Sequence, residues 1–233
     1  MESTKKTARI AGVLWLLMAL AGGFGLGYIR GYVIVPDNAA ASAGNILASE
    51  TMFRLAITST LIGQVLYFFF ALQLFRLFRN RHAWLPIVLL ASIMMTVVTG
   101  VANQLNNFGA LYILSGAEFL KAFSTEQLNA MAMVYLRQAN GPGQGLLEIF
   151  WVPYHLAFGL LAIKSGYFPK ILGILLMIAG VGFGVNLLDK FIMPAFYPAA
   201  FTTTAMALSA LSVFPTMLWL LIKGVRSPVT INE

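Results

Sequence analysis

Six separate stretches of about 20 mostly apolar residues constrain the fold of this chain more than any other feature. They lie at about 9–29, 54–75, 85–105, 146–163, 171–188 and 205–222. An apolar α-helix of about 20 residues spans the hydrocarbon core of a bilayer. Only 10% of the residues are charged, against roughly 25% in a soluble domain. We therefore expect an all-α polytopic membrane bundle of six transmembrane helices, with residues 1–233 forming a single integral membrane domain.

The basic residues predict how these helices are oriented. If the N-terminus is cytoplasmic, ten lysines and arginines fall on the inner side and five on the outer side. The inner residues are Lys5, Lys6, Arg9, Arg76, Arg79, Arg81, Lys164, Lys170, Lys223 and Arg226, and the outer ones are Arg30, Arg54, Lys121, Arg137 and Lys190. The positive-inside rule then places both termini in the cytoplasm, and we expect a bacterial cytoplasmic membrane. We attribute the net charge of +7 to this bias and to membrane lipids as partners, and expect no binding of nucleic acid.

Two long connections, at 31–53 and 106–145, are expected on the outer side. In the first, Asp37 precedes an alanine-rich stretch and is expected to be its N-cap. In the second, Ser124-Thr125-Glu126-Gln127 has the spacing of a capping box, which predicts a surface helix that ends at Gly141-Pro142-Gly143. The fold should thus include short extracytoplasmic helices. The first apolar stretch has some features of a signal peptide, but it continues beyond the candidate cleavage site, so we expect it to remain as a helix.

Several kinds of chemistry are disfavoured by the sequence. The chain has no cysteine, which removes disulfides, thiolate nucleophiles and thiolate metal ligands. It has no G-x-S-x-G segment of the kind that presents a nucleophilic serine. The glycine-rich segment GGFGLG at 22–27 lies inside an apolar stretch and follows no strand, so we interpret it as a site of close helix packing and not as a phosphate loop.

Glu148 and His155 are the most conspicuous polar pair in an apolar stretch. Seven residues apart, they share a helix face but are separated by about 10.5 Å along the axis. Two metal ligands on one helix need a spacing of three or four residues, and His82, the other histidine, falls on the opposite side of the membrane. We therefore expect no metal and no cofactor. Glu148 is expected at the outer interface, within reach of water or a basic side chain, and His155 near the midplane.

Polar residues of other stretches occur at similar depths, and together with this pair they could line a cavity that opens outward. The candidate ligand-binding residues are Glu50, Arg54, Gln64, Asn103, Asn107, Glu148, His155, Asn186 and Asp189. Ionisable groups inside a membrane are functional candidates by default. Asn, Gln and Thr also cross-link transmembrane helices at about 0.6 kcal/mol each, so a purely structural role stays open.

Several segments together resemble a known family. They are RIAG before the first apolar stretch, NILASETMFRL before the second, SGAEFLKAF, and above all KSGYFPKILGILLMIAGVGF. From about Arg9 to Val225 the chain resembles bacterial membrane proteins catalogued as domain of unknown function 4386. The resemblance implies a single multi-pass domain with an uncleaved first helix, and it implies no activity. It also points to Asn45, Glu50, Phe53 and Arg54 as positions with a shared role in folding or binding.

The function we predict is the binding or transport of a small or lipophilic molecule through an outward-facing polar cavity. Arg54 and Glu50 would hold a polar group at its mouth, and Asn103, Glu148 and Asn186 would bind it further in, with His155 at the floor. The first alternative is an intramembrane lipid-modifying enzyme, which needs His155 and a carboxylate within about 3 Å or one water. The second is a structural or partner subunit without a ligand site. We favour a role that is not enzymatic, and the sequence leaves homo-oligomers open.

Overall fold

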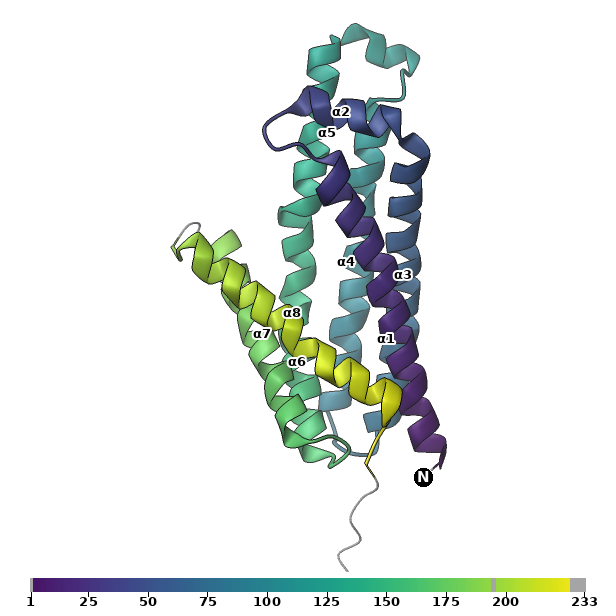
Figure 1. The fold of residues 1–233 in the computed structure, drawn as a ribbon, viewed down its shortest axis with the longest axis vertical. Coiled ribbons are helices and arrows are strands. Elements are labelled where there is room, and N and C mark those ends of the chain that lie inside the picture. The colour runs from purple at the N-terminus through teal and green to yellow at the C-terminus, as the bar shows by residue number, and fades with distance from the viewer. Residues whose placement is uncertain (1, 194–195, 227–233) are drawn as a thin grey trace, which may run out of the picture. The chain divides into compact units, whose positions relative to one another are not determined.

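The computed structural model describes residues 2–193 and 196–226, and every regular element in this part of the chain is helical (Figure 1). The elements in chain order are α1 (Glu2–Tyr28), the π-helical turn η1 (Ile29–Val33), α2 (Ala39–Ala48), α3 (Glu50–Phe78), α4 (Leu85–Ile113), the 3-10 turn η2 (Glu118–Ala122), α5 (Thr125–Asn140), α6 (Pro142–Lys164), α7 (Lys170–Phe191) and α8 (Ala199–Ile222).

Six helical segments within the described residues are long and apolar enough to cross a membrane. They are Glu2–Val33, Glu50–Phe78, Leu85–Ile113, Thr125–Lys164, Lys170–Phe191 and Ala200–Ile222, and each contains one of the six apolar stretches of the sequence. The prediction of an all-α fold with six such helices is confirmed. By length and composition, these helices indicate a multi-pass membrane protein.

The start of α6 differs from the prediction. The Gly141-Pro142-Gly143 segment ends α5 as expected, but α6 begins at once with Pro142 and not at residue 146. Proline suits the first position of a helix because its fixed φ is already helical and the amide hydrogen it lacks would have no acceptor there. The capping box of α5 is confirmed: the Ser124 hydroxyl accepts from the Gln127 amide, and the Gln127 side chain accepts from the Ser124 amide.

The N-cap of α2 is Asn38, so the prediction of Asp37 as the cap is wrong. The Asn38 side chain accepts a hydrogen bond of 2.9 Å from the Ala41 amide. Asp37 instead adopts a left-handed conformation with φ of 56°, and its carboxylate pairs with the Arg137 guanidinium of α5. Aspartate tolerates this backbone region better than most residues, and a carboxylate that is engaged by an arginine does not cap the following helix.

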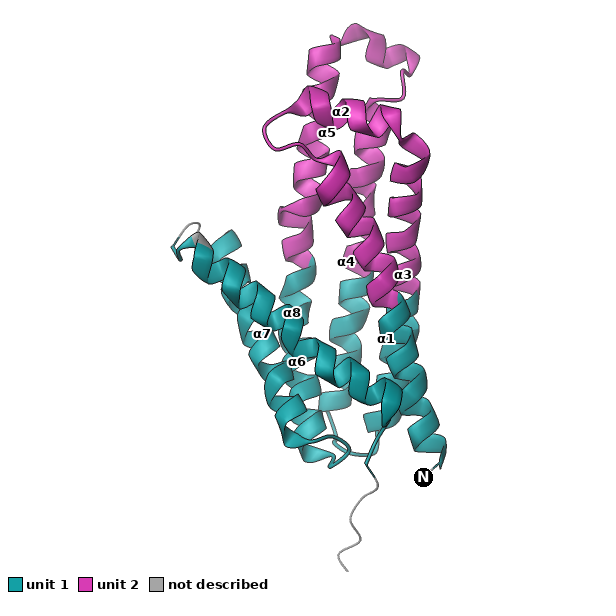
Figure 2. Cartoon of the chain, in the orientation of Figure 1, with its two compact units in different colours: residues 1–17, 66–97, 147–233 teal, residues 18–65, 98–146 magenta. Residues whose placement is uncertain are grey.

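The described chain divides into two compact units, which Figure 2 distinguishes by colour. Unit 1 comprises residues 1–17, 66–97 and 147–233, and unit 2 comprises residues 18–65 and 98–146. Helices α1, α3, α4 and α6 each contribute residues to both units. The expectation of a single membrane domain stays a prediction.

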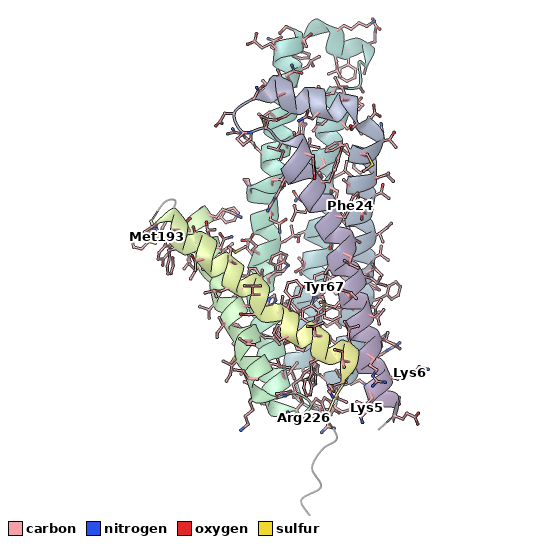
Figure 3. The ribbon with its side chains drawn as sticks, viewed as in Figure 1. Lys5, Lys6, Phe24, Tyr67, Met193 and Arg226 are labelled. Carbon is pink, nitrogen blue, oxygen red and sulfur yellow. The ribbon has the colours of Figure 1, made fainter. Side chains whose placement is uncertain are left out.

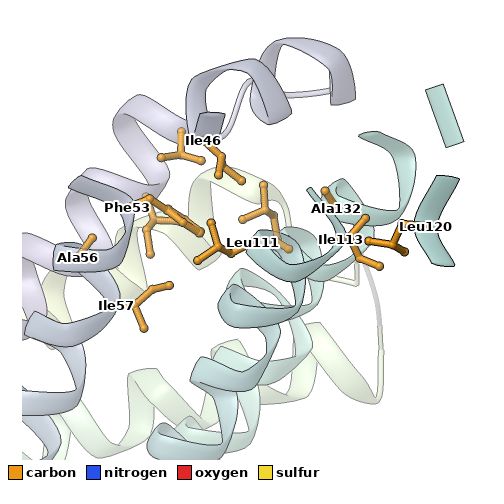
Figure 4. Packing of buried hydrophobic residues seen from close by; sticks show 12 residues of the cluster. Ile46, Phe53, Ala56, Ile57, Leu111, Ile113, Leu120 and Ala132 are labelled. Atoms are coloured by element: carbon orange, nitrogen blue, oxygen red, sulfur yellow. The ribbon is translucent and has the colours of Figure 1, made fainter. Parts of the chain in front are cut away.

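Unit 2 is built on an aliphatic core in which helices α2 and α5 pack together (Figure 4). Ile46 of α2, Phe53 and Ile57 of α3, Leu111 of α4 and Leu136 of α5 are buried side by side in one cluster. Leu128, Met131 and Tyr135 of α5 are partly buried against the same cluster, so one face of the predicted surface helix is internal.

Unit 1 has an aromatic core and a close helix crossing. The ring of Phe158 on α6 lies 5.9 to 6.1 Å, centroid to centroid, from those of Trp15, Phe78, Tyr154 and Phe168. Helix α7 packs along α8 (Figure 1). Helix α7 also approaches α6 so closely that a Cβ on either Gly159 or Gly173 would lie 2.6 Å from the other residue's carbonyl oxygen. Small residues permit such backbone contact between apolar helices.

Candidate functional site

The nine residues predicted to line one cavity belong to both units. Glu148, His155, Asn186 and Asp189 are in unit 1, whereas Glu50, Arg54, Gln64, Asn103 and Asn107 are in unit 2. The local partners of each residue show whether its side chain holds helices together or is open to a ligand.

Glu148 is the centre of a buried polar cluster between α6 and α7. Its side chain is 2% exposed, one carboxylate oxygen accepts a hydrogen bond from the Asn186 side-chain amide, and the other lies 3.4 Å from Nζ of Lys190. Of the two partners expected for Glu148, water or a basic side chain, the structure provides the basic side chain, and α7 covers the carboxylate. A buried carboxylate needs such a partner, since an isolated charge in an apolar interior is strongly unfavourable.

Lys190 is a residue of this cluster that was not predicted as a site residue. It lies four residues after Asn186 on α7, a spacing that places both side chains on the same helix face. This spacing, together with the lone carboxylate of the preceding apolar stretch, could have indicated Lys190 as the partner of Glu148. The arrangement cross-links α6 and α7 and leaves no oxygen of Glu148 without a polar neighbour.

His155 lies in an aromatic environment. Its Nδ1 donates to the Trp151 carbonyl oxygen at 2.7 Å, one turn earlier on α6. Its ring centroid lies 4.3 Å from that of Tyr154 and 5.0 Å from that of Phe183. Within residues 2–193 and 196–226, no carboxylate forms a hydrogen bond or an ion pair with His155. These contacts are typical of a histidine side chain that packs in a protein core.

The remaining candidate of unit 1, Asp189, serves the end of α7. Its carboxylate accepts a hydrogen bond of 3.3 Å from the backbone amide of Tyr197, in the connection that leads to α8. This contact closes the turn between the two helices. In the described part of the chain, no three side chains of the His, Asp or Glu type gather closely enough to hold a metal ion.

The amides of unit 2 are largely engaged within the protein. The Asn103 side chain donates to the Ala139 carbonyl at 2.9 Å and so links α4 to α5, while Asn107 donates to the buried side chain of Gln104 at 2.9 Å. Gln104 was not recognised in the sequence. Two buried acceptors, Oε1 of Gln64 and Oδ1 of Asn107, have no hydrogen-bond partner among the described residues.

Arg54 is the predicted residue that borders a recess. The recess has a volume of about 400 Å³ and is lined by Arg54, Phe108, Gly109, Leu111, Tyr112 and Ser115. None of the other eight predicted residues lines it. The Arg54 Nε donates to the Glu50 carboxylate at 2.7 Å one turn earlier, and both side chains are about half exposed. The lining is almost entirely apolar, so the recess joins an apolar surface to a single guanidinium group.

Comparisons with known proteins identify a family. Neither the curated proteins nor the solved structures compared with the chain gave a match. The family described as a domain of unknown function (DUF4386) matches residues 10–224, nearly the whole chain, and this confirms the resemblance seen in the sequence motifs. With its six long apolar helices, the chain is a multi-pass membrane protein that belongs to the DUF4386 family.

Proposed function

We propose that this protein binds a lipophilic anion at the Arg54 recess of unit 2, as a carrier or receptor for a small amphipathic molecule. The observation that carries the proposal is the combination of an apolar recess of about 400 Å³ with one exposed guanidinium at its edge. Recesses of a few hundred Å³, lined by apolar side chains and a few polar groups, are typical of small-molecule sites.

The side chains of the recess suit the two ends of such a molecule. Phe108 and Tyr112 are 39% and 57% exposed on α4, so a hydrocarbon chain placed against them would remove apolar surface from water. The Glu50 carboxylate holds Arg54 through Nε, and the terminal Nη groups donate no hydrogen bond within the described residues. An arginine fixed in this way presents its free N–H groups to a carboxylate or phosphate oxygen.

The partners of His155 favour binding over catalysis. The enzyme alternative needs a carboxylate beside this histidine, either directly or through one water. The described part of the chain instead places the Trp151 carbonyl and two aromatic rings there. We therefore assign His155 to the packing of α6 against α7.

We place the recess on the outer side of a bacterial cytoplasmic membrane, with both termini in the cytoplasm. Support comes from the described helix ends: Arg76 lies in the last turn of α3, Lys164 in the last turn of α6, and Lys170 begins α7. Arg54 lies in the second turn of α3, at the other end of that helix from Arg76. A cytoplasmic excess of lysine and arginine near helix ends orients membrane proteins.

Single cysteines test this orientation cleanly, because the chain has no cysteine of its own. A Lys121→Cys variant should react with a membrane-impermeant maleimide in intact cells. A Lys164→Cys variant should react only after the cells are permeabilised. Labelling of Lys164→Cys in intact cells, with protection of Lys121→Cys, would reverse the orientation and place the Arg54 recess on the cytoplasmic side.

A fluorescent fatty acid tests the ligand. With purified protein in a nonionic detergent, cis-parinaric acid is expected to bind and to be displaced by oleate more readily than by oleyl alcohol, which lacks the charge. Arg54→Gln should weaken binding of cis-parinaric acid roughly fivefold, the factor that corresponds to about 1 kcal/mol for an exposed ionic contact. The difference between oleate and oleyl alcohol should then disappear.

Two further variants control this experiment. Lys121→Gln removes an equal charge from a similarly exposed ion pair that does not border the recess, and binding should be unchanged. Ser115→Trp fills the recess and should weaken oleate and oleyl alcohol alike. Equal effects of Arg54→Gln and Lys121→Gln would contradict the assignment of Arg54, and normal binding by Ser115→Trp would contradict the recess as the site.

A further inference from the structure

Unit 1 contains a second recess, and its lining is polar and basic where that of the Arg54 recess is apolar. It has a volume of about 440 Å³, and its lining includes Arg76 at the end of α3, Arg79 and Arg81 in the following connection, the hydroxyl residues Ser3 and Thr4 of α1, and Tyr167. The lining is mainly polar. Three arginines therefore line one small volume.

The positive charge of this recess has no carboxylate partner among the residues that the structure describes. No carboxylate is among the described residues that line it, and none of its three arginines forms an ion pair with a described residue. Glu2, next to Ser3 in the sequence, forms no such pair either. In unit 2, by contrast, Lys121 and Arg137, like Arg54, each pair with a carboxylate. An anion in the recess would offset the mutual repulsion of the guanidinium groups.

One of the three arginines is held in a defined position. Arg81 Nε donates to the Tyr167 hydroxyl at 2.7 Å, and its guanidinium carbon lies 4.4 Å from the centroid of the same ring. Tyr167 is buried, and its carbonyl accepts a hydrogen bond from the Arg226 amide at 2.9 Å. The Nη groups of Arg81 donate no hydrogen bond to a described residue. A guanidinium fixed in this way loses little further freedom when it binds an oxygen anion.

The recess has further basic residues and an exposed apolar helix face near it, a combination that suits the headgroup and the acyl chains of a lipid. Lys5, Lys6 and Arg226 lie at the same end of unit 1 (Figure 3). Along α1, Ser3, Ile10 and Leu17 fall within about 40° of one another at 100° per residue. Ile10 and Leu17 are 40% and 45% exposed. The helix face that begins at the recess thus continues as an exposed apolar surface.

We infer that this recess binds the phosphate group of an anionic phospholipid, with the acyl chains along the exposed face of α1. Phosphate oxygens are matched by guanidinium donors and by serine and threonine hydroxyls. The apolar face favours a lipid over a soluble phosphate ester, which would use the same guanidinium groups but leave that face uncovered. This site is independent of the Arg54 recess, and its failure would leave the proposed function standing.

The test uses the full-length protein, stripped of lipid in a nonionic detergent and titrated in native mass spectrometry. Phosphatidylglycerol, phosphatidylcholine with the same acyl chains, and glycerol 3-phosphate are the three probes. Each arginine near an anionic headgroup contributes about a fivefold factor, so Arg76→Gln/Arg79→Gln should weaken binding of phosphatidylglycerol about 25-fold. Arg76→Lys/Arg79→Lys should restore most of the affinity. Arg81 is left unchanged because it also positions Tyr167.

A matched control separates this site from a general attraction between opposite charges. Lys164→Gln/Lys170→Gln removes the same charge from exposed residues of unit 1 outside the recess, and affinity should stay within about twofold. Equal weakening in both double variants would overturn the inference, as would binding of phosphatidylcholine as tight as that of phosphatidylglycerol. If glycerol 3-phosphate binds as tightly as phosphatidylglycerol, the phosphate site stands but its ligand is a soluble ester and not a lipid.

Discussion

Gly173→Ala is expected to lower the free energy of unfolding of the purified protein by about 2 kcal/mol, with a corresponding fall in its melting temperature in detergent. The added Cβ would lie 2.6 Å from the Gly159 carbonyl oxygen and 2.5 Å from a side-chain carbon of Ile163. The Ile163 side chain can rotate away, but the carbonyl belongs to the backbone of α6. The two helices must therefore separate, which loses contacts along their whole interface.

Gly184→Ala on the same helix is the matched control. The nearest atom to its added Cβ is a methyl carbon of Val152 at 3.8 Å, an ordinary contact distance. Alanine favours a helix by about 1 kcal/mol over glycine, so this variant should be as stable as the wild type or more so. Thermal unfolding followed by circular dichroism in one detergent compares the two. Equal melting temperatures for both variants would contradict the close crossing of α6 and α7.

Glu148→Gln should have the second largest effect, a loss of about 1 to 3 kcal/mol. Removing one partner of a buried ion pair costs roughly 3 to 5 kcal/mol because the other charge is left without compensation. The value expected here is smaller because the Lys190 side chain is 29% exposed and can still reach water or headgroups. Glutamine preserves the shape and can still accept from Asn186, so the loss reports mainly on the charge.

Two comparisons make this result interpretable. Glu118→Gln removes the partner of Lys121 in an exposed ion pair and should change stability by less than about 0.5 kcal/mol. In the double variant Glu148→Gln/Lys190→Met, the uncompensated charge is gone, and part of the lost stability should return. If Glu148→Gln were as stable as Glu118→Gln, or if the double variant only added a further loss, the buried pair would not stabilise the α6–α7 contact.

The helical architecture could be predicted from the sequence because its causes are local. Apolar stretches of about 20 residues form helices in a membrane since every backbone polar group must be paired within its own segment. The capping box at Ser124 was likewise predictable, because its two hydrogen bonds join residues three apart. The cap of α2 was not, because the partner of Asp37 is Arg137, a residue 100 positions away.

The candidate site could be predicted only in part, for the same reason. Arg54 was identified from its place at the end of an apolar stretch, but the recess beside it depends on how α3 and α4 pack. His155 was predicted as a site residue because it is a histidine within an apolar stretch. Its contacts with Tyr154 and Phe183 show that it packs in the core between α6 and α7. Arg76, Arg79 and Arg81 were read as one part of a basic inner side, and only folding brings them to one recess with α1.

By itself, the sequence determined that this chain is helical, that six helices can cross a membrane and where the apolar centre of each helix lies, since hydrophobicity acts over short distances along the chain. The tertiary structure decided which polar groups are satisfied and which face a recess. The charge of Glu148 is compensated by Lys190 of another helix, whereas the arginines beside Tyr167 have no carboxylate partner among the described residues. Charge compensation depends on distances of a few ångströms between residues far apart in the chain, and packing alone sets those distances.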